Sequence, residues 1–222
     1  MLDGIDLVIL DFDGVVADSE VISLRTLQSS LADFGIDLSA DDVRSAFLGT
    51  SLATIAGYVA EHGPARTATG FAEAWQTALF ARFRAELRPI PHLLALLEHL
   101  ADRGIRHCIA SSGTFERIGV ALSAIRLTER FEKIFSAEQV DRGKPAPDLF
   151  LMAAHQLGVP PAKCAVVEDS PYGVRAARAA DMRSIGFVGG THLKHIQAEH
   201  ADLLRRNGAD CVVASLHEIA GP

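Results

Sequence analysis

The stretch Leu7–Gly14, LVILDFDG, decides the fold that we expect for this chain. Its four apolar residues predict a buried strand, and two carboxylates, Asp11 and Asp13, follow at i and i+2. Side chains two residues apart in an extended segment point the same way, so both charges are directed at one place. Gly14 allows the chain to turn away tightly. Two acids aimed at one place require a cation, or a reaction that uses them.

Other short apolar runs have the same strand-like composition, and segments with helical periodicity lie between the later ones. These runs cover residues 105–110, 164–167, 183–188 and 211–213. Strands that alternate with helices form parallel sheets covered on both faces. The sequence therefore predicts an α/β fold whose core is a Rossmann-like, doubly wound parallel sheet.

About ninety residues separate the first predicted strand from the second, which is far more than a simple crossover needs. Within them the apolar spacing predicts only helices, over residues 19–34, 39–48, 51–62 and 69–87. We expect an inserted α-helical cap domain over residues 18–88, and a core domain formed by residues 1–17 and 89–222.

Composition limits the class of protein. The 222 residues are 49% hydrophobic and 22% charged, as in globular enzymes, and the net charge is −7 without a run of basic residues. Nucleic acid and membrane surfaces are therefore not expected partners, and no obligate protein partner is inferred. The chain shows neither a membrane-spanning run nor a signal peptide, and its three scattered cysteines indicate reduced thiols, so a cytoplasmic location is expected.

Polar residues follow two more of the expected strands, and another precedes an expected helix. Ligands bind at the carboxyl ends of strands in open parallel sheets, and there the sequence places Ser111-Ser112-Gly113 and Glu168-Asp169, with Lys144 in a loop before a helix. Together with Asp11 and Asp13, four carboxylates face one lysine, and they cannot all be ionised without a cation. Because every candidate ligand is a hard oxygen, we expect Mg²⁺.

These groups suit phosphoryl transfer. Asp11 is expected to attack phosphorus and form an aspartyl phosphate, while Asp13 protonates the leaving oxygen and later activates water. Lys144 and Mg²⁺ would stabilise the transferring group. The predicted phosphate-binding set is Ser111, Ser112, Lys144 and Gly14.

Four stretches in this order, DFDGVVADS (11–19), IASSG (109–113), GKPAPD (143–148) and VVEDS (166–170), resemble motifs I to IV of the haloacid dehalogenase-like hydrolase superfamily. The resemblance is to the branch with a helical cap, which includes β-phosphoglucomutases and sugar-phosphate phosphatases. It implies that Asp11 is the nucleophile and that Asp13 is the general acid/base. It also implies a metal site formed by Asp11, the Asp13 backbone carbonyl, Glu168 and Asp169, phosphate contacts from Ser111 and Lys144, and a cap specificity loop at Gly49, Thr50 and Ser51.

The expected function is that of a Mg²⁺-dependent phosphatase acting on a small phosphorylated metabolite, a sugar or polyol phosphate. A sugar phosphomutase is the first alternative, and it is disfavoured because Ser23 and Leu52 stand where β-phosphoglucomutases have a histidine and an arginine. A non-catalytic phosphoacceptor or binding module is the second, although such a module needs neither Asp13 nor a large cap.

Some polar residues have a simpler interpretation. Ser111 and Ser112 could cap the helix that begins near Thr114, a role compatible with phosphate binding. His192, His195 and His200 do not fall on one helix face, so we interpret them as part of a solvated helix and not as metal ligands.

Overall fold

The computed structural model of the chain describes residues 1–48, 50, 52–63 and 70–220. The chain divides into two compact units. The first unit comprises Met1–Asp18 and Arg88–Pro222, and the second comprises Ser19–Leu87. We call them the core unit and the helical unit and describe each by itself.

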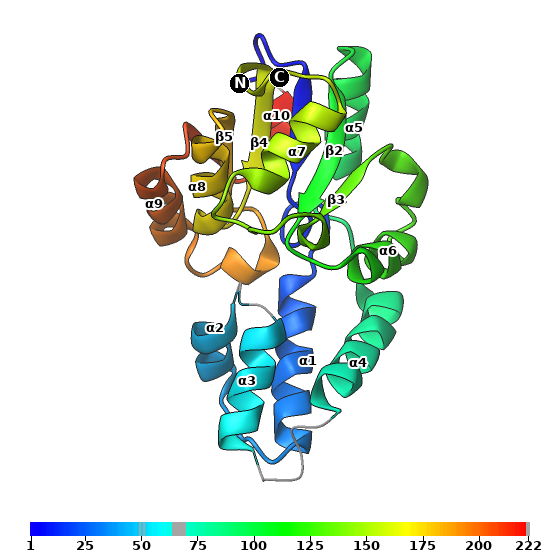
Figure 1. Cartoon of the computed structure of the whole chain (residues 1–222), viewed down its shortest axis with the longest axis vertical. Helices are drawn as coiled ribbons and strands as arrows, with labels where there is room; N and C mark the ends of the chain where they lie inside the picture. The colour runs from blue at the N-terminus through cyan, green and yellow to red at the C-terminus, as the bar shows by residue number, and fades with distance from the viewer. Residues whose placement is uncertain (49, 51, 64–69, 221–222) are drawn as a thin grey trace. The chain divides into compact units, whose positions relative to one another are not determined.

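The described residues of the core unit form a six-stranded sheet with the order β3-β2-β1-β4-β5-β6, and all of its pairings are parallel (Figure 1). The strands are β1 (Leu7–Leu10), β2 (Arg106–Ser111), β3 (Ile134–Ser136), β4 (Cys164–Glu168), β5 (Arg183–Phe187) and β6 (Cys211–Val213). The first strand lies in the centre, between β2 and β4. From β1 the chain runs through β2 to β3 at one edge, and it then crosses back to β4 and continues to β6 at the other edge. Open α/β sheets form a crevice at the carboxyl ends of their strands where the strand order reverses in this way.

Helices precede, connect or follow these strands. They are α5 (Leu93–Asp102), α6 (Phe115–Ala124), α7 (Asp148–Gln156), α8 (Pro171–Ala179), α9 (Gln197–Asn207) and α10 (His217–Ala220), with 3₁₀ turns that include η2 (Ala137–Gln139) and η4 (Thr191–Leu193). Alternate strand residues such as Leu7, Ile9 and Val166 bury one face of the sheet against α7 and α8. Helix α5 contacts β2 and α10. The predicted fold class is confirmed.

The helical unit contains four helices in its described part, α1 (Glu20–Asp33), α2 (Ala40–Phe47), α3 (Leu52–His62) and α4 (Phe71–Glu86). They share a core of their own, formed mainly by Leu27, Leu31, Phe47, Val59 and Phe71. Helix α2 begins with a capping box between Ser39 and Asp42. The apolar spacing of the sequence thus predicted the helices of this unit, because each has one face buried against the others.

Two further observations concern the described part of the chain. None of its helices is both long enough and apolar enough to span a membrane. Its three cysteines are free thiols, of which Cys108 in β2 and Cys164 in β4 are buried, and burial raises the pKa of both, that of Cys164 to about 11.

Candidate active site

Strand β1 delivers Asp11 to the carboxyl edge of the sheet. Leu10 pairs with Ile109 of β2 and with Val167 of β4, so the next residue, Asp11, lies beside the ends of both neighbouring strands. Its backbone N–H donates to Val167 O at 3.0 Å. The chain then turns sharply, with Gly14 N–H donating to Ala17 O at 2.8 Å.

Gly14 is required in this turn for two reasons. Its φ of +82° is in the left-handed region, and a Cβ at this position would lie 1.9 Å from Asp169 Oδ2. The glycine therefore lets the loop after β1 approach the acidic pair after β4. We predicted Gly14 as a phosphate contact, and the structure places it against the carboxylate of Asp169.

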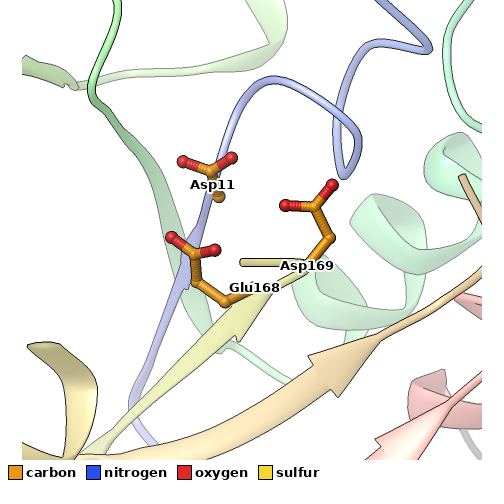
Figure 2. Close-up of side chains that lie close together, drawn as sticks. All are labelled: Asp11, Glu168 and Asp169. Carbon is orange, nitrogen blue, oxygen red and sulfur yellow. The ribbon is translucent and has the colours of Figure 1, made fainter. Parts of the chain in front are cut away.

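Three carboxylates converge at the centre of the site, as Figure 2 shows. Asp11, Glu168 and Asp169 are all buried, and one oxygen from each lies within 4.8 Å of the others. Glu168 is the last residue of β4, and its Oε2 accepts from Ser170 N–H at 3.0 Å. The carboxylate fits closely against helix α8, because a Cβ at Gly173 would lie 1.8 Å from Glu168 Oε1.

Lys144 joins this cluster from the loop before α7. Its Nζ donates to Asp11 Oδ1 at 2.5 Å, to Glu168 Oε1 at 2.6 Å and to Ala110 O at 3.0 Å. The side chain is only 4% exposed. Lys144 therefore connects the nucleophile candidate to the ends of β2 and β4.

The electrostatics of this cluster are set by burial. Burial raises the pKa of Asp11 well above its usual value, Glu168 and Asp169 raise it further, and Lys144 lowers it. Burial likewise raises the pKa of Glu168, again against the opposing effect of Lys144. Burial alone would lower the pKa of Lys144, but Asp11 and Glu168 raise it, so the ammonium form persists. The site thus tends to retain protons on its carboxyl groups when no further positive charge is present.

The candidate phosphate loop follows β2. Ser111 is buried at the end of the strand, and its Oγ accepts from Gly113 N–H at 3.0 Å, whereas Ser112 is exposed. Thr114, and neither serine, caps α6 by accepting from Arg117 N–H. The cap interpretation of Ser111 and Ser112 is therefore wrong, and both remain candidates for binding an anion at this helix N-terminus.

Asp13 has a partner that sequence reasoning missed. Arg117 Nη2 donates to Asp13 Oδ1 at 2.8 Å, and Arg117 Nε lies 3.4 Å from Asp13 Oδ2. The Asp13 carboxylate does not join the group formed by Asp11, Glu168 and Asp169 among the described residues. The expected metal contact of Asp13 is through its backbone carbonyl, and this side-chain pairing does not alter that expectation.

Two histidines surround Asp169. His192, in η4, places Nε2 3.2 Å from Asp169 Oδ2, and His200, in α9, donates from Nε2 to Asp169 O at 2.6 Å. His192 is buried and His195 is exposed. The interpretation of all three as a solvated helix is therefore wrong. Residues 191–193 form a separate 3₁₀ turn that ends before α9 begins, so the helical periodicity assumed for residues 192–200 does not apply.

The expected specificity loop is only partly described. Gly49 and Ser51 lie outside the described residues. Thr50 belongs to the helical unit and is exposed, and its Oγ1 donates to Phe47 O at 2.9 Å.

The residues at the core site fit a divalent cation. The four carboxylates of Asp11, Asp13, Glu168 and Asp169 face two cationic side chains, Lys144 and Arg117, which leaves a formal charge of −2. All the donors in the converging group are oxygens, the set that Mg²⁺ prefers. A divalent cation would cancel the charge and allow Asp11 to ionise.

The buried carboxylate cluster lies at the carboxyl edge of a Rossmann-like sheet, beside a lysine and a serine-containing loop. This arrangement indicates an α/β enzyme. The family model for haloacid dehalogenase-like hydrolases matches residues 8–187. The chain therefore belongs to the haloacid dehalogenase-like hydrolase family, and the resemblance seen in the sequence is confirmed.

Similar proteins agree with this assignment. The chain is 30% identical over 194 residues to the 6-phosphogluconate phosphatase of Escherichia coli, with 86% of each chain covered. It is 34% identical over 186 residues to SUPPRESSOR OF QUENCHING 1 of Arabidopsis thaliana, covering 80% of this chain and 17% of that much longer protein. A hydrolase of the family from Deinococcus radiodurans, solved with bound phosphate and sodium, has a TM-score of 0.78 at 32% identity, covering 97% of this chain and 93% of that one.

Proposed function

We propose that this protein is a Mg²⁺-dependent phosphatase that hydrolyses a small phosphorylated metabolite, a sugar or polyol phosphate, through an aspartyl phosphate on Asp11. The observation that carries this proposal is the contact of buried Asp11 with Lys144, beside Glu168 and Asp169, at the sheet edge where β1, β2 and β4 end. A carboxylate held against an ammonium group, beside the strand that ends in the proposed phosphate loop, suits attack on phosphorus.

In the first step, an oxygen of Asp11 forms a bond to phosphorus and the bond from phosphorus to the leaving oxygen breaks. Asp13 supplies the proton that the leaving oxygen needs. Lys144, the Ser111 hydroxyl and the Ser112 N–H stabilise charge on the transferring phosphoryl group. When bound, the Mg²⁺ ion would add positive charge at Asp11, Glu168 and Asp169 and so favour ionised Asp11.

In the second step, water attacks the aspartyl phosphate, and Asp13 accepts a proton from it. The acyl phosphate bond breaks, which releases inorganic phosphate and restores the Asp11 carboxylate. Asp13 ends the cycle in the protonation state in which it began, so no further reactant is needed.

We also propose that the helical unit, Ser19–Leu87, acts as a cap that selects the substrate and excludes water during the reaction. The chain enters and leaves this unit through adjacent backbone segments, since Asp18 N–H donates to Arg88 O at 3.0 Å. Two neighbouring linkers of this kind are suited to a hinge. Gly49, Thr50 and Ser51 are the proposed specificity loop. The relative named for 6-phosphogluconate supports a phosphorylated sugar or sugar derivative as the substrate.

Phosphate release from a panel of phosphorylated sugars, sugar acids and polyols, measured with Mg²⁺ and with EDTA, tests the proposal. We expect release that requires Mg²⁺ and that Asp11→Asn abolishes. Conversion of a sugar phosphate to its isomer without phosphate release would instead indicate a mutase. Stable phosphorylation without turnover would indicate a phosphoacceptor module. Activity that survives in Asp11→Asn would contradict the proposal directly.

A further inference from the structure

Arg117 forms a forked contact with Asp13 in the core unit. Nη2 and Nε face the two carboxylate oxygens at 2.8 Å and 3.4 Å, and the two side chains are only 16% and 17% exposed. A planar guanidinium that faces both oxygens restrains the rotation of the carboxylate as well as its position. Asp13 belongs to the turn after β1, and its partner is 104 residues further along the chain.

The backbone of Arg117 is itself fixed. The residue lies in the first turn of α6, which follows the phosphate loop directly (Figure 1), and its N–H donates to the capping Oγ1 of Thr114 at 3.2 Å. A cation in the first turn of a helix is unfavourable, because the N-terminal end of the helix dipole is positive. An arginine there needs a compensating interaction, and the carboxylate of Asp13 supplies one.

We propose that Arg117 is a positioning residue that holds the Asp13 carboxylate in the orientation needed for proton transfer to the leaving oxygen. This inference rests on the proposed phosphatase function, and it assigns to Arg117 a role that acts through Asp13 and not through the phosphoryl group. General acid catalysis depends on the position of the acid relative to the leaving oxygen. A free Asp13 on a tight turn has several rotamers, and only some of them point at that oxygen.

The leaving group separates this role from direct binding of phosphate. An alkoxide leaving from a sugar phosphate needs a proton, whereas 4-nitrophenolate leaves without one. The burst of 4-nitrophenolate in the first turnover therefore reports phosphoryl transfer to Asp11 with little contribution from Asp13. Loss of Arg117 should slow the sugar phosphate reaction and spare the 4-nitrophenyl phosphate burst.

The experiment compares wild type, Arg117→Met, Arg117→Lys, Asp13→Asn and the double variant Arg117→Met/Asp13→Asn at saturating Mg²⁺. We expect Arg117→Met to lower kcat for the best sugar phosphate by about 10- to 100-fold, with KM and the burst rate for 4-nitrophenyl phosphate changed by less than about threefold. Arg117→Lys should recover only part of kcat, because an ammonium group cannot face both oxygens. The double variant should be no slower than Asp13→Asn alone.

Arg205→Met is the matched control, because Arg205 forms a 2.8 Å ion pair with Asp202 on the exposed surface of α9. It should retain wild-type kinetics. Circular dichroism and the thermal midpoint identify any variant that fails to fold, and Arg117→Lys then provides the comparison in place of Arg117→Met.

Several results would overturn the inference. An equal loss of the 4-nitrophenolate burst would show that Arg117 acts on the phosphoryl group, and unchanged kinetics would show that it has no part in the reaction. A further loss in the double variant beyond that of Asp13→Asn would show a role independent of Asp13. Failure of the proposed function looks different, because wild type would then give no Mg²⁺-dependent burst, or Asp11→Asn would retain one.

Discussion

At the scale of single residues, Gly173 determines where the Glu168 carboxylate can lie. A Cβ at position 173 would lie 1.8 Å from Glu168 Oε1 and 1.9 Å from Glu168 Cδ, so Gly173→Ala forces the carboxylate out of its place. Displaced Glu168 would lose its contact with Lys144 and its place beside Asp11. We expect Mg²⁺ affinity, measured by titration calorimetry, to fall by about 10- to 100-fold, with a matching rise in the Mg²⁺ concentration that activity requires.

Gly119→Ala is the control for that substitution. Gly119 also lies in a helix, α6, but nothing lies within 4 Å of a Cβ built there. An alanine in an open helical position should stabilise the protein by about 0.5–1 kcal/mol and leave Mg²⁺ binding unchanged. If Gly173→Ala binds Mg²⁺ as tightly as Gly119→Ala does, the close fit of Glu168 against α8 is not needed for the cation.

His192 provides a second prediction at this scale. Its Nε2 lies 3.2 Å from Asp169 Oδ2, and its ring fills the space between Gly14 and Gly190, where added Cβ atoms would lie 3.0 Å and 2.7 Å from its Cε1. Groups that contact a metal-binding carboxylate orient it, and losing them commonly costs about 10- to 100-fold in metal affinity. We expect a loss of this size in His192→Ala, and none in the exposed neighbour variant His195→Ala, by Mg²⁺ titration calorimetry. Equal affinities in both variants would limit His192 to a packing role.

At the scale of secondary structure elements, the three-residue strand β3 supports the proposed phosphate loop, residues 111–113. Ser136, its last residue, is fully buried, and its Oγ donates to Gly113 O at 2.6 Å and accepts from Glu138 N–H at 3.2 Å. Ser136→Ala leaves both of these backbone groups without their partner. We expect a loss of about 1–3 kcal/mol in the free energy of unfolding by urea titration, together with a rise of about threefold or more in KM because the loop is less well fixed.

Ser184→Ala is the matched control for Ser136→Ala. Ser184 is a fully buried serine in β5, and within the described part of the chain its Oγ has no hydrogen-bond partner. Removing an unpaired buried hydroxyl should not destabilise the protein, because the hydroxyl is desolvated without a compensating hydrogen bond, and it should leave KM unchanged. Similar losses in both variants would mean that burial of the serine side chain, and not its bond to Gly113, matters.

The strands of the sheet show which elements could be predicted from the sequence and which could not. Strands of the central sheet are continuous apolar runs buried on both faces, and for this reason LVIL and CAVV predicted β1 and β4. Residues Ile134–Ser136 were not predicted as a strand, since three residues carry no recognisable period and pair only with the end of β2. His92 and Asp181 both have positive φ, +66° and +56°, and because neither is a glycine, their residue types gave no sign of this backbone conformation.

The candidate site residues also include some that the sequence indicates and others that it does not. Asp11, Ser111, Lys144 and Glu168 could be found because each follows or precedes a recognisable element and carries a motif residue. Arg117 and His192 could not be found, because their contacts join segments far apart in the chain, and their own positions look like those of ordinary helix and loop residues. A cation in the first turn of α6 was the only local signal for Arg117.

At the scale of the whole molecule, the acidic cluster couples stability to pH. Burial raises the folded-state pKa values of Asp11 and Glu168 above their usual values of 3.8 and 4.5. At a pH above those usual pKa values, the unfolded chain has lost the protons of Asp11 and Glu168, while the folded chain without a cation still holds them. The folded state then binds more protons than the unfolded state, so the free energy of unfolding falls as pH rises toward the raised pKa values.

Asp11→Asn tests this coupling, because it removes one of the two groups while retaining the contact of Lys144 with Glu168. In EDTA, we expect the free energy of unfolding of wild type to fall relative to that of Asp11→Asn as pH rises above the usual carboxyl range, measured by urea titration. Added Mg²⁺ should raise the stability of wild type and reduce this difference, since it binds the ionised carboxylates of the folded state. Asp202→Asn, which alters an exposed carboxylate in α9, should follow the wild-type pH curve. Parallel curves for wild type and Asp11→Asn in EDTA would show that the buried acids are not the source of the pH dependence, and that their charge is balanced without a cation.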